Sequence, residues 1–265
     1  MPSTQLNQIE LYYQSFGQGE PLLFVHGLGS SVRDWENQVP FFSGRYRVVA
    51  LDLRGHGRSD KPPGPYSCPL FAKDIAALVM SLEIGPVHVV GLSLGGFVAC
   101  QLVVDHPELV RTLTMINSVP GLPRDRFRDR LRIASTLALR RFIVRRFGMR
   151  ALGRFLSTKL FPRTDQKVLR QEFIERWAEN DREAYLSSLA SVSEWSLENQ
   201  LDAIRCPTCL MSGEHDFFPL ELKQTYAARL SDAQLVMIPD SGHFTPMDEP
   251  KRFNAALMAF LAERG

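Results

Sequence analysis

A serine in a tight, glycine-flanked turn has the clearest chemical potential in this sequence. Ser93 lies in the middle of GLSLG (residues 91–95), after an apolar run at 87–90 and before a helix-like run at 97–104. This order predicts a strand, a sharp turn and a helix, with glycines that let strand and helix cross closely. The hydroxyl would project beside a helix N-terminus, where free N–H groups favour negative charge. The pattern indicates a nucleophile; the alternative is an ordinary serine in a glycine-rich turn.

Two later residues could activate this serine. A serine hydroxyl is a weak nucleophile at neutral pH, so it needs a base and a group that orients the base. Such groups collect at the carboxyl ends of parallel strands. Asp216 follows an apolar run at 208–212, and His243 follows another at 234–238. We therefore predict Ser93 as nucleophile, His243 as base and Asp216 as orienting acid.

Two other acids compete for the orienting role. Glu214 comes earlier in the same turn as Asp216, and Asp240 is close enough to His243 to be a solvated loop residue. We prefer Asp216 as the group that holds the imidazole tautomer and stabilises the protonated ring. For His243, the alternative is a loop histidine without a catalytic role.

An attacked carbonyl also needs two N–H donors for its developing negative charge. We predict the backbone N–H of Leu94, directly after the nucleophile, and that of Leu28, in the sequence HGLG that follows the apolar run at 21–25. Glycines on both sides of Leu28 would let the backbone approach a substrate. His26 is expected to hold this loop by hydrogen bonds rather than to move protons. The residues that we expect around the substrate are His26, Gly27, Leu92, Phe217 and Phe244.

These residues need a framework in which several strands end side by side. Residues 9–16 alternate like antiparallel edge strands, and the buried strands are predicted at 21–25, 46–52, 87–90, 110–116, 208–212 and 234–238. Helices are predicted from Ser31, with Trp35 and Val39 inward, after a Ser67 N-cap, after Ser93, and at 220–230 and 250–263. Residues 120–200 read as helices without strands. Strand–helix alternation implies an α/β fold with a mainly parallel sheet, interrupted by a helical insertion.

Together these segments resemble the α/β-hydrolase superfamily. The matching motifs are HGLG at 26–29, DxRGHGRS at 52–59, GxSxGG at 91–96, GxxD at 213–216 and GH at 242–243. The resemblance implies a mostly parallel eight-stranded sheet flanked by helices. The core would comprise 1–119 and 201–265, and a helical cap would comprise 120–200. It also places Arg54 and His56 in a structural loop beside the site rather than among the catalytic residues.

The nucleophile type narrows the chemistry within that superfamily. The similar haloalkane dehalogenases and epoxide hydrolases carry Asp at the turn, whereas Ser93 favours acyl transfer. Cofactor-free haloperoxidase-like members usually have Met where this chain has Leu94, which disfavours that reaction. The leading expectation is a carboxylic-ester hydrolase that prefers a fairly hydrophobic acyl chain. The alternatives are a thioesterase or lysophospholipase acting on an anionic amphiphile and, below these, a haloperoxidase-like enzyme or a non-catalytic ligand-binding relative.

The predicted cap is rich in arginine and poor in acids. Its arginines are Arg124, Arg126, Arg128, Arg130, Arg132, Arg140, Arg141, Arg145, Arg146, Arg150 and Arg154. Between them lie Phe127, Leu131, Leu137, Phe142, Ile143, Val144, Phe147, Leu152, Phe155 and Leu156. This pattern is typical of basic amphipathic helices. They could form a solvated face over an apolar pocket, or they could contact an anionic lipid, an acyl-CoA or a membrane surface.

Composition sets broader expectations. The chain has 265 residues, 45% hydrophobic and 23% charged, and a net charge of +2, which gives no overall case for nucleic-acid binding. The first residues lack a signal-peptide pattern, and no apolar run approaches the ~18–20 residues of a transmembrane helix, so a cytoplasmic protein is expected. We expect no cofactor and a small-molecule acyl ester as substrate, with the protein a monomer or homodimer. The histidine spacings match no metal motif, and the CPTC sequence at 206–209 is read as buried free thiols.

A dinucleotide-binding domain is the main rival outside this superfamily. The glycines at 27 and 29 follow a strand, and Asp52 ends the next strand at a suitable distance for a ribose acid. Val32 stands where the third glycine of that fingerprint belongs. The missing glycine disfavours nucleotide binding.

Overall fold

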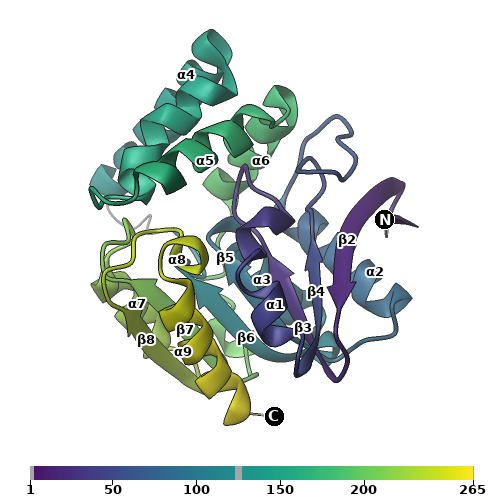
Figure 1. Ribbon diagram of the computed structural model, residues 1–265. Helices are drawn as coiled ribbons and strands as arrows, with labels where there is room; N and C mark the ends of the chain where they lie inside the picture. Colours follow the sequence, from purple (N-terminus) through teal and green to yellow (C-terminus); the bar gives the residue numbers. More distant parts are fainter. Residues whose placement is uncertain (1–2, 123–126, 265) are drawn as a thin grey trace.

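A computed structural model describes residues 3–122 and 127–264, and a twisted sheet lies at its centre (Figure 1). The strands are β1 (Ser3–Leu6), β2 (Ile9–Phe16), β3 (Glu20–Val25), β4 (Tyr46–Leu51), β5 (Val87–Leu92), β6 (Val110–Ile116), β7 (Thr208–Gly213) and β8 (Ala233–Ile238). They form an eight-stranded sheet in the order β1-β2-β4-β3-β5-β6-β7-β8. Strand β2 pairs antiparallel with both β1 and β4, and the pairs among β3 to β8 are all parallel. The predicted α/β fold with a mostly parallel eight-stranded sheet is confirmed.

Helices flank this sheet and also form a separate group at one end of it (Figure 1). They are α1 (Val39–Phe42), α2 (Cys68–Ser81), α3 (Leu94–Asp105), α4 (Phe127–Leu160), α5 (Lys167–Ala178), α6 (Arg182–Glu194), α7 (Leu220–Ala227), α8 (Thr245–Asp248) and α9 (Pro250–Ala262). Helices α4, α5 and α6 lie between β6 and β7 in the chain and are consistent with the expected cap, whose boundaries stay a prediction. Arg124 and Arg126 lie outside the described residues. No helix in the described part of the chain is long and apolar enough to cross a membrane.

Local sequence signals explain most of the element ends. Ser67 caps α2 as predicted, because its Oγ accepts the Leu70 N–H at 3.2 Å. The single helix expected from Ser31 is instead a 3₁₀ turn at Val32–Trp35 followed by the short α1. Pro40 explains the break, because its ring clashes with the preceding helical turn and it suits the start of a new helix. The strand β1 was not anticipated by the sequence.

The turn between β5 and α3 forms as predicted, with Ser93 at its apex. Ser93 has φ 53° and ψ −113°, a backbone conformation that residues other than glycine rarely adopt. The close crossing of β5 and α3 imposes it. A Cβ on Gly91 would lie 2.2 Å from the Gly95 carbonyl oxygen, and a Cβ on Gly95 would lie 2.1 Å from that of Val25. Both contacts are with backbone, which cannot move aside. Only glycine therefore fits on either side of the serine.

We expect Gly95→Ala to destabilise the fold by about 3 kcal/mol or more, because the added methyl overlaps the β3 backbone. Gly44→Ala is the matched control, since a Cβ at Gly44 meets nothing within 4 Å. The control should leave the free energy of unfolding within about 1 kcal/mol of the parent value. Urea unfolding measures both variants. Equal stabilities for the two variants would contradict this account of the turn.

Candidate active site

The loops after β7 and β8 bring Asp216 and His243 together. The His243 Nδ1–H donates to Asp216 Oδ1 over 2.6 Å, and the two side chains are 4% and 1% exposed. Phe217 stacks on the imidazole with 3.9 Å between ring centroids. A proton held on Nδ1 leaves Nε2 as the basic nitrogen. The arrangement thus orients the ring for accepting a proton at Nε2.

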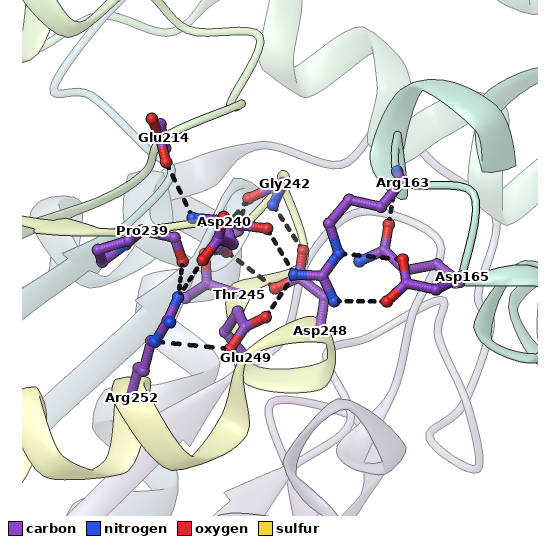
Figure 2. A network of polar contacts seen from close by, with 12 residues as sticks. Arg163, Asp165, Glu214, Pro239, Asp240, Gly242, Thr245, Asp248, Glu249 and Arg252 are labelled. Atoms are coloured by element: carbon purple, nitrogen blue, oxygen red, sulfur yellow. Dashed lines mark hydrogen bonds and ion pairs between the residues drawn. The ribbon is translucent and has the colours of Figure 1, made fainter.

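The two competing acids face other partners (Figure 2). Glu214 Oε2 accepts the Asp240 backbone N–H at 2.9 Å. The Asp240 carboxylate pairs with Arg252 at 2.6 Å. Both are loop interactions at the surface. Asp216 is therefore the carboxylate that contacts His243.

Asn117, directly after β6, connects three loops of the site and was missed by sequence reasoning. Its Nδ2 donates to the carbonyl oxygens of Gly242 (3.1 Å) and His243 (2.7 Å), and its Oδ1 accepts the Gly213 N–H at 2.7 Å. Asn117 is fully buried and has φ 46°, which asparagine tolerates better than most residues. An asparagine at the end of a buried strand was the one available signal. Its amide fixes the His243 loop relative to β6 and β7.

The His243 loop is also tied to the segment that follows α4 (Figure 2). Asp248 accepts the Gly242 N–H at 2.6 Å and the Ser241 hydroxyl at 2.8 Å. Arg163 donates to the Asp240 carbonyl oxygen at 2.9 Å and pairs with Glu249 at 2.5 Å. The end of the cap helix is thus attached beside the predicted base.

A buried lysine contacts the same acid from the other side, and sequence reasoning missed it too. The Lys223 Nζ, on α7, lies 2.5 Å from Asp216 Oδ2 and donates to Ser212 Oγ at 2.7 Å. Burial opposes ionisation of Asp216, but His243 and then Lys223 outweigh it and lower the pKa of the carboxyl. Burial lowers the pKa of Lys223, and Asp216 opposes that shift. The carboxylate therefore sits between two proton-bearing groups.

The loop after β3 has the structure of a backbone donor site. The His26 ring is fully buried, donates from Nδ1 to the Gly27 carbonyl oxygen at 2.7 Å and accepts the Leu53 N–H at Nε2 over 3.0 Å. Burial lowers the pKa of His26 to about 4, so the ring is neutral and structural, as expected. Within the described residues, no hydrogen bond uses the N–H of Leu28 or Leu94. Both amides are available to a ligand.

A cavity of about 380 Å³ lies beside the predicted nucleophile, base and backbone donors. Ser93, His243 and the two predicted donors, Leu28 and Leu94, all line it. Of the predicted pocket residues, the lining includes Gly27, Phe217 and Phe244 but neither His26 nor Leu92. The hydrogen bonds of the described chain include none between Ser93 Oγ and the imidazole, and catalytic hydrogen bonds often tighten only when substrate binds. The structure therefore places Ser93 and His243 in the lining of the same cavity, without a direct hydrogen bond between them.

Asp52, which would bind the ribose in a dinucleotide-binding domain, is already hydrogen-bonded within the protein. Asp52 is buried, and its two oxygens accept the N–H groups of Val32 (2.7 Å) and Arg58 (2.8 Å). The neighbouring Arg54 forms a buried bidentate pair with Asp74 at 2.5 and 2.8 Å. These contacts hold the loop at 52–60 and leave no ribose acid.

Metal ligation has no obvious place in the part of the chain that the structure describes. No cluster there of three or more His, Cys, Asp or Glu side chains could hold an ion. Cys209 is buried within β7, Cys206 is half-buried, and both are free thiols. Burial raises the pKa of Cys209 to about 12, which disfavours the thiolate form that metals and disulfides require.

Comparison with known proteins gives one consistent family. The model of the alpha/beta hydrolase family matches residues 22–256. The 3-oxoadipate enol-lactonase 2 of Acinetobacter baylyi is 24% identical, over 96% of this chain and 93% of that protein. A thermophilic esterase from Thermogutta terrifontis shares 25% identity and a TM-score of 0.86, covering 96% of this chain and 94% of that one. A bromoperoxidase from Bacillus anthracis shares 25% identity and a TM-score of 0.89, with 96% of each chain covered.

The names of these relatives describe different reactions, so the reaction of this chain has to be argued from its own site. What they share is the architecture, and hydrolases are prominent among them. The family match spans most of the chain and agrees with the eight-stranded sheet and the serine turn. This protein belongs to the alpha/beta hydrolase family.

Proposed function

We propose that the protein hydrolyses carboxylic esters with a fairly hydrophobic acyl chain, through an acyl-enzyme on Ser93. The observation that carries this proposal is the imidazole of His243, held by Asp216 at the wall of the cavity that Ser93 also lines. A base with a fixed tautomer beside a serine at a strand–helix turn is the arrangement that acyl transfer needs.

Acylation begins when His243 Nε2 takes the Ser93 proton and Oγ attacks the ester carbonyl. The carbonyl oxygen becomes an oxyanion that accepts hydrogen bonds from the N–H groups of Leu28 and Leu94. The imidazolium, stabilised by Asp216, then protonates the leaving alcohol as the C–O bond breaks. The acyl group remains bound to Ser93 Oγ.

Deacylation repeats these steps with water in place of the serine. His243 Nε2 takes a proton from water, whose oxygen attacks the acyl carbon. The same two N–H groups stabilise the second oxyanion. The C–O bond to Ser93 breaks, His243 returns the proton to Oγ, and the carboxylic acid leaves.

The lining of the cavity supports a hydrophobic acyl chain. Around Ser93 it is largely aliphatic and aromatic, with contributions from Phe97, Leu137, Phe155, Val192 and Leu222. A volume of about 380 Å³ lies in the range of small-molecule sites. Each buried methylene of a substrate chain contributes about 0.8 kcal/mol of binding. Longer acyl chains should therefore lower KM until the cavity is full.

A thioesterase or lysophospholipase reaction would use the same nucleophile, base and donors. The leaving group distinguishes these enzymes, and a substrate panel decides between them. Such a panel combines a chain-length series of 4-nitrophenyl esters with an acyl-CoA and a lysophospholipid. We expect the esters of medium chain length to give the highest kcat/KM.

Ser93→Ala should lower ester turnover by about 10⁴-fold or more, because it removes the atom that forms the acyl-enzyme. Initial rates on the 4-nitrophenyl ester series measure this. Covalent labelling by a fluorophosphonate probe should be lost in the same variant.

Ser81→Ala is the control, because Ser81 lies at the end of α2, outside the cavity lining, and its hydroxyl donates to the Leu78 carbonyl oxygen. It should retain both turnover and labelling. Labelling that persists in Ser93→Ala, or the absence of Ser93-dependent turnover on every acyl substrate, would overturn the proposal.

A further inference from the structure

The lining of the cavity beside Ser93 includes basic side chains and no acidic one among the described residues. Arg132, Arg140 and Lys159, all on α4, line it. No aspartate or glutamate is found among the described residues of its lining. A largely apolar cavity with three cations at one side is electrostatically complementary to an anion.

Arg140 is the most enclosed of the three cations. Its Nε is shielded from water and has no hydrogen-bond acceptor among the described atoms. Other cap arginines have carboxylate partners, such as Arg150 with Glu175 and Arg176 with Glu36. The ion pairs of the described residues include none for Arg140. An enclosed donor without an acceptor is costly, and an incoming acceptor removes that cost.

Arg140 also lies on the side of the predicted oxyanion loop. Burial raises the pKa of the Tyr185 phenol, and the positive charge of Arg140 and its polar contact with the phenol oppose that shift, so the two groups are neighbours. Neither the phenol oxygen nor Arg140 Nε makes a well-formed hydrogen bond among the described atoms. Tyr185 in turn packs on that loop, since its Cε2 would lie 3.2 Å from a Cβ on Gly29. An anion on Arg140 would therefore belong to a substrate held at the same loop.

The other two cations are more hydrated. The Arg132 side chain is 66% exposed and lies 3.7 Å from Asp129. Lys159 is exposed, with its Nζ 4.5 Å from the centroid of the Phe155 ring. These two side chains supply positive potential, whereas Arg140 supplies a planar donor group suited to a carboxylate.

We propose that the cavity binds an ester that bears a carboxylate, and that Arg140 binds this carboxylate while Arg132 and Lys159 add positive potential. The inference rests on the proposed ester hydrolysis and names its substrate class. The rest of the substrate is apolar and fills the remainder of the cavity. Esters whose acyl chain ends in a carboxylate are therefore preferred to neutral esters of the same chain length.

The test compares 4-nitrophenyl hexanoate with mono-4-nitrophenyl adipate, which have the same chain length and differ in a terminal carboxylate. The parent protein should have the higher kcat/KM on the adipate ester. Arg140→Gln should lower the adipate-to-hexanoate ratio of kcat/KM by about 10- to 100-fold. Arg141→Gln, at the next position of α4 and outside the cavity lining, should leave the ratio unchanged. A parent preference for hexanoate, or an unchanged ratio in Arg140→Gln, would overturn the anion site.

Direct binding separates this inference from the proposed function. Calorimetric titration of adipate into Ser93→Ala should show binding that weakens at least tenfold when Arg140→Gln is added. If neither ester is turned over but this difference is found, the hydrolase proposal fails and the anion site stands. If both esters are hydrolysed and adipate binds equally to the two proteins, the anion site fails and the hydrolase proposal stands.

A second inference concerns Lys223, whose contact with Asp216 is independent of the cavity. The Lys223 side chain is fully enclosed, and its Nζ meets Asp216 Oδ2 at 2.5 Å. The other carboxylate oxygen holds His243. The nearest other acids face elsewhere, Glu214 and Asp240 toward the surface and Asp248 toward the Ser241 hydroxyl. Asp216 therefore responds mainly to one lysine and one histidine.

The sign of the effect follows from charge balance. The Asp216 carboxylate attracts the positive charge that the imidazole of His243 gains when it accepts a proton during the reaction. With the Lys223 ammonium beside it, the carboxylate is already compensated, and the imidazolium gains less. We infer that Lys223 is a positioning residue that holds the Asp216 carboxylate and limits how strongly it stabilises the imidazolium.

Lys223→Gln removes the charge and keeps a hydrogen-bond donor. We expect the acidic limb of the kcat/KM–pH profile to move up by about one pH unit, so activity falls about tenfold at pH 6 and far less at pH 9. Lys223→Arg, which retains the charge, should restore the parent limb. Lys251→Met, at an exposed position of α9, should leave the profile unchanged.

A purely structural role would give a different pattern. Lys223→Gln would then lower the unfolding midpoint and reduce kcat/KM equally at all pH values, which would overturn the inference. If Lys223→Gln fails to fold, the profile of Lys223→Met, which keeps an apolar stem of similar length without the charge, replaces it. An acidic limb at the parent pH in either variant would also overturn the inference.

Discussion

The hydrogen bond between His243 and Asp216 is the interaction on which the site depends, and it is made where water has no access. A buried carboxylate is expensive unless opposite charge and hydrogen bonds compensate it. Here both oxygens are occupied, one by the imidazole at 2.6 Å and the other by the Lys223 ammonium at 2.5 Å. Burial raises the pKa of Asp216, but its two partners outweigh burial and keep the pKa low. The base is therefore oriented by an anion that stays ionised at neutral pH.

Hydrogen bonds between short side chains and the backbone also hold this pair in position. The amide of Asn117 bridges the end of β6, the end of β7 and the loop that carries His243. Asp248, the last residue of α8, ties the same loop to that helix by accepting the Gly242 N–H. Short side chains bonded to main-chain groups have little conformational freedom left. The geometry of the loops is thus set before a substrate arrives, which is what electrostatic stabilisation of a transition state requires.

Sequence patterns predicted the parts of this structure that depend on neighbouring residues. The serine turn, the Ser67 cap and the buried parallel strands are encoded in short runs, and the order of strands and helices then predicts the sheet. Asn117 and Lys223 were missed because their roles come from distant partners: a lysine on α7 reads as a solvent-facing residue until the fold encloses it. The roles of Ser93, Asp216 and His243 remain predictions from residue type and order, although the structure places Asp216 on His243 and Ser93 at the same cavity.

The predicted cap makes two kinds of contact: some attach it to the core, and others line the cavity. Exposed ion pairs across its boundary, such as Arg33 with Glu179, contribute little each. The apolar contact is larger, because Phe161 and Phe173 pack on Phe244 with ring centroids 5.4 to 5.7 Å apart. Phe244 and Trp177 also line the cavity, so substitutions that reshape the apolar wall loosen the cap as well. Among the described residues, the cationic side chains of the lining form no ion pair with the core of the fold, which makes them the positions where substitution costs the fold least.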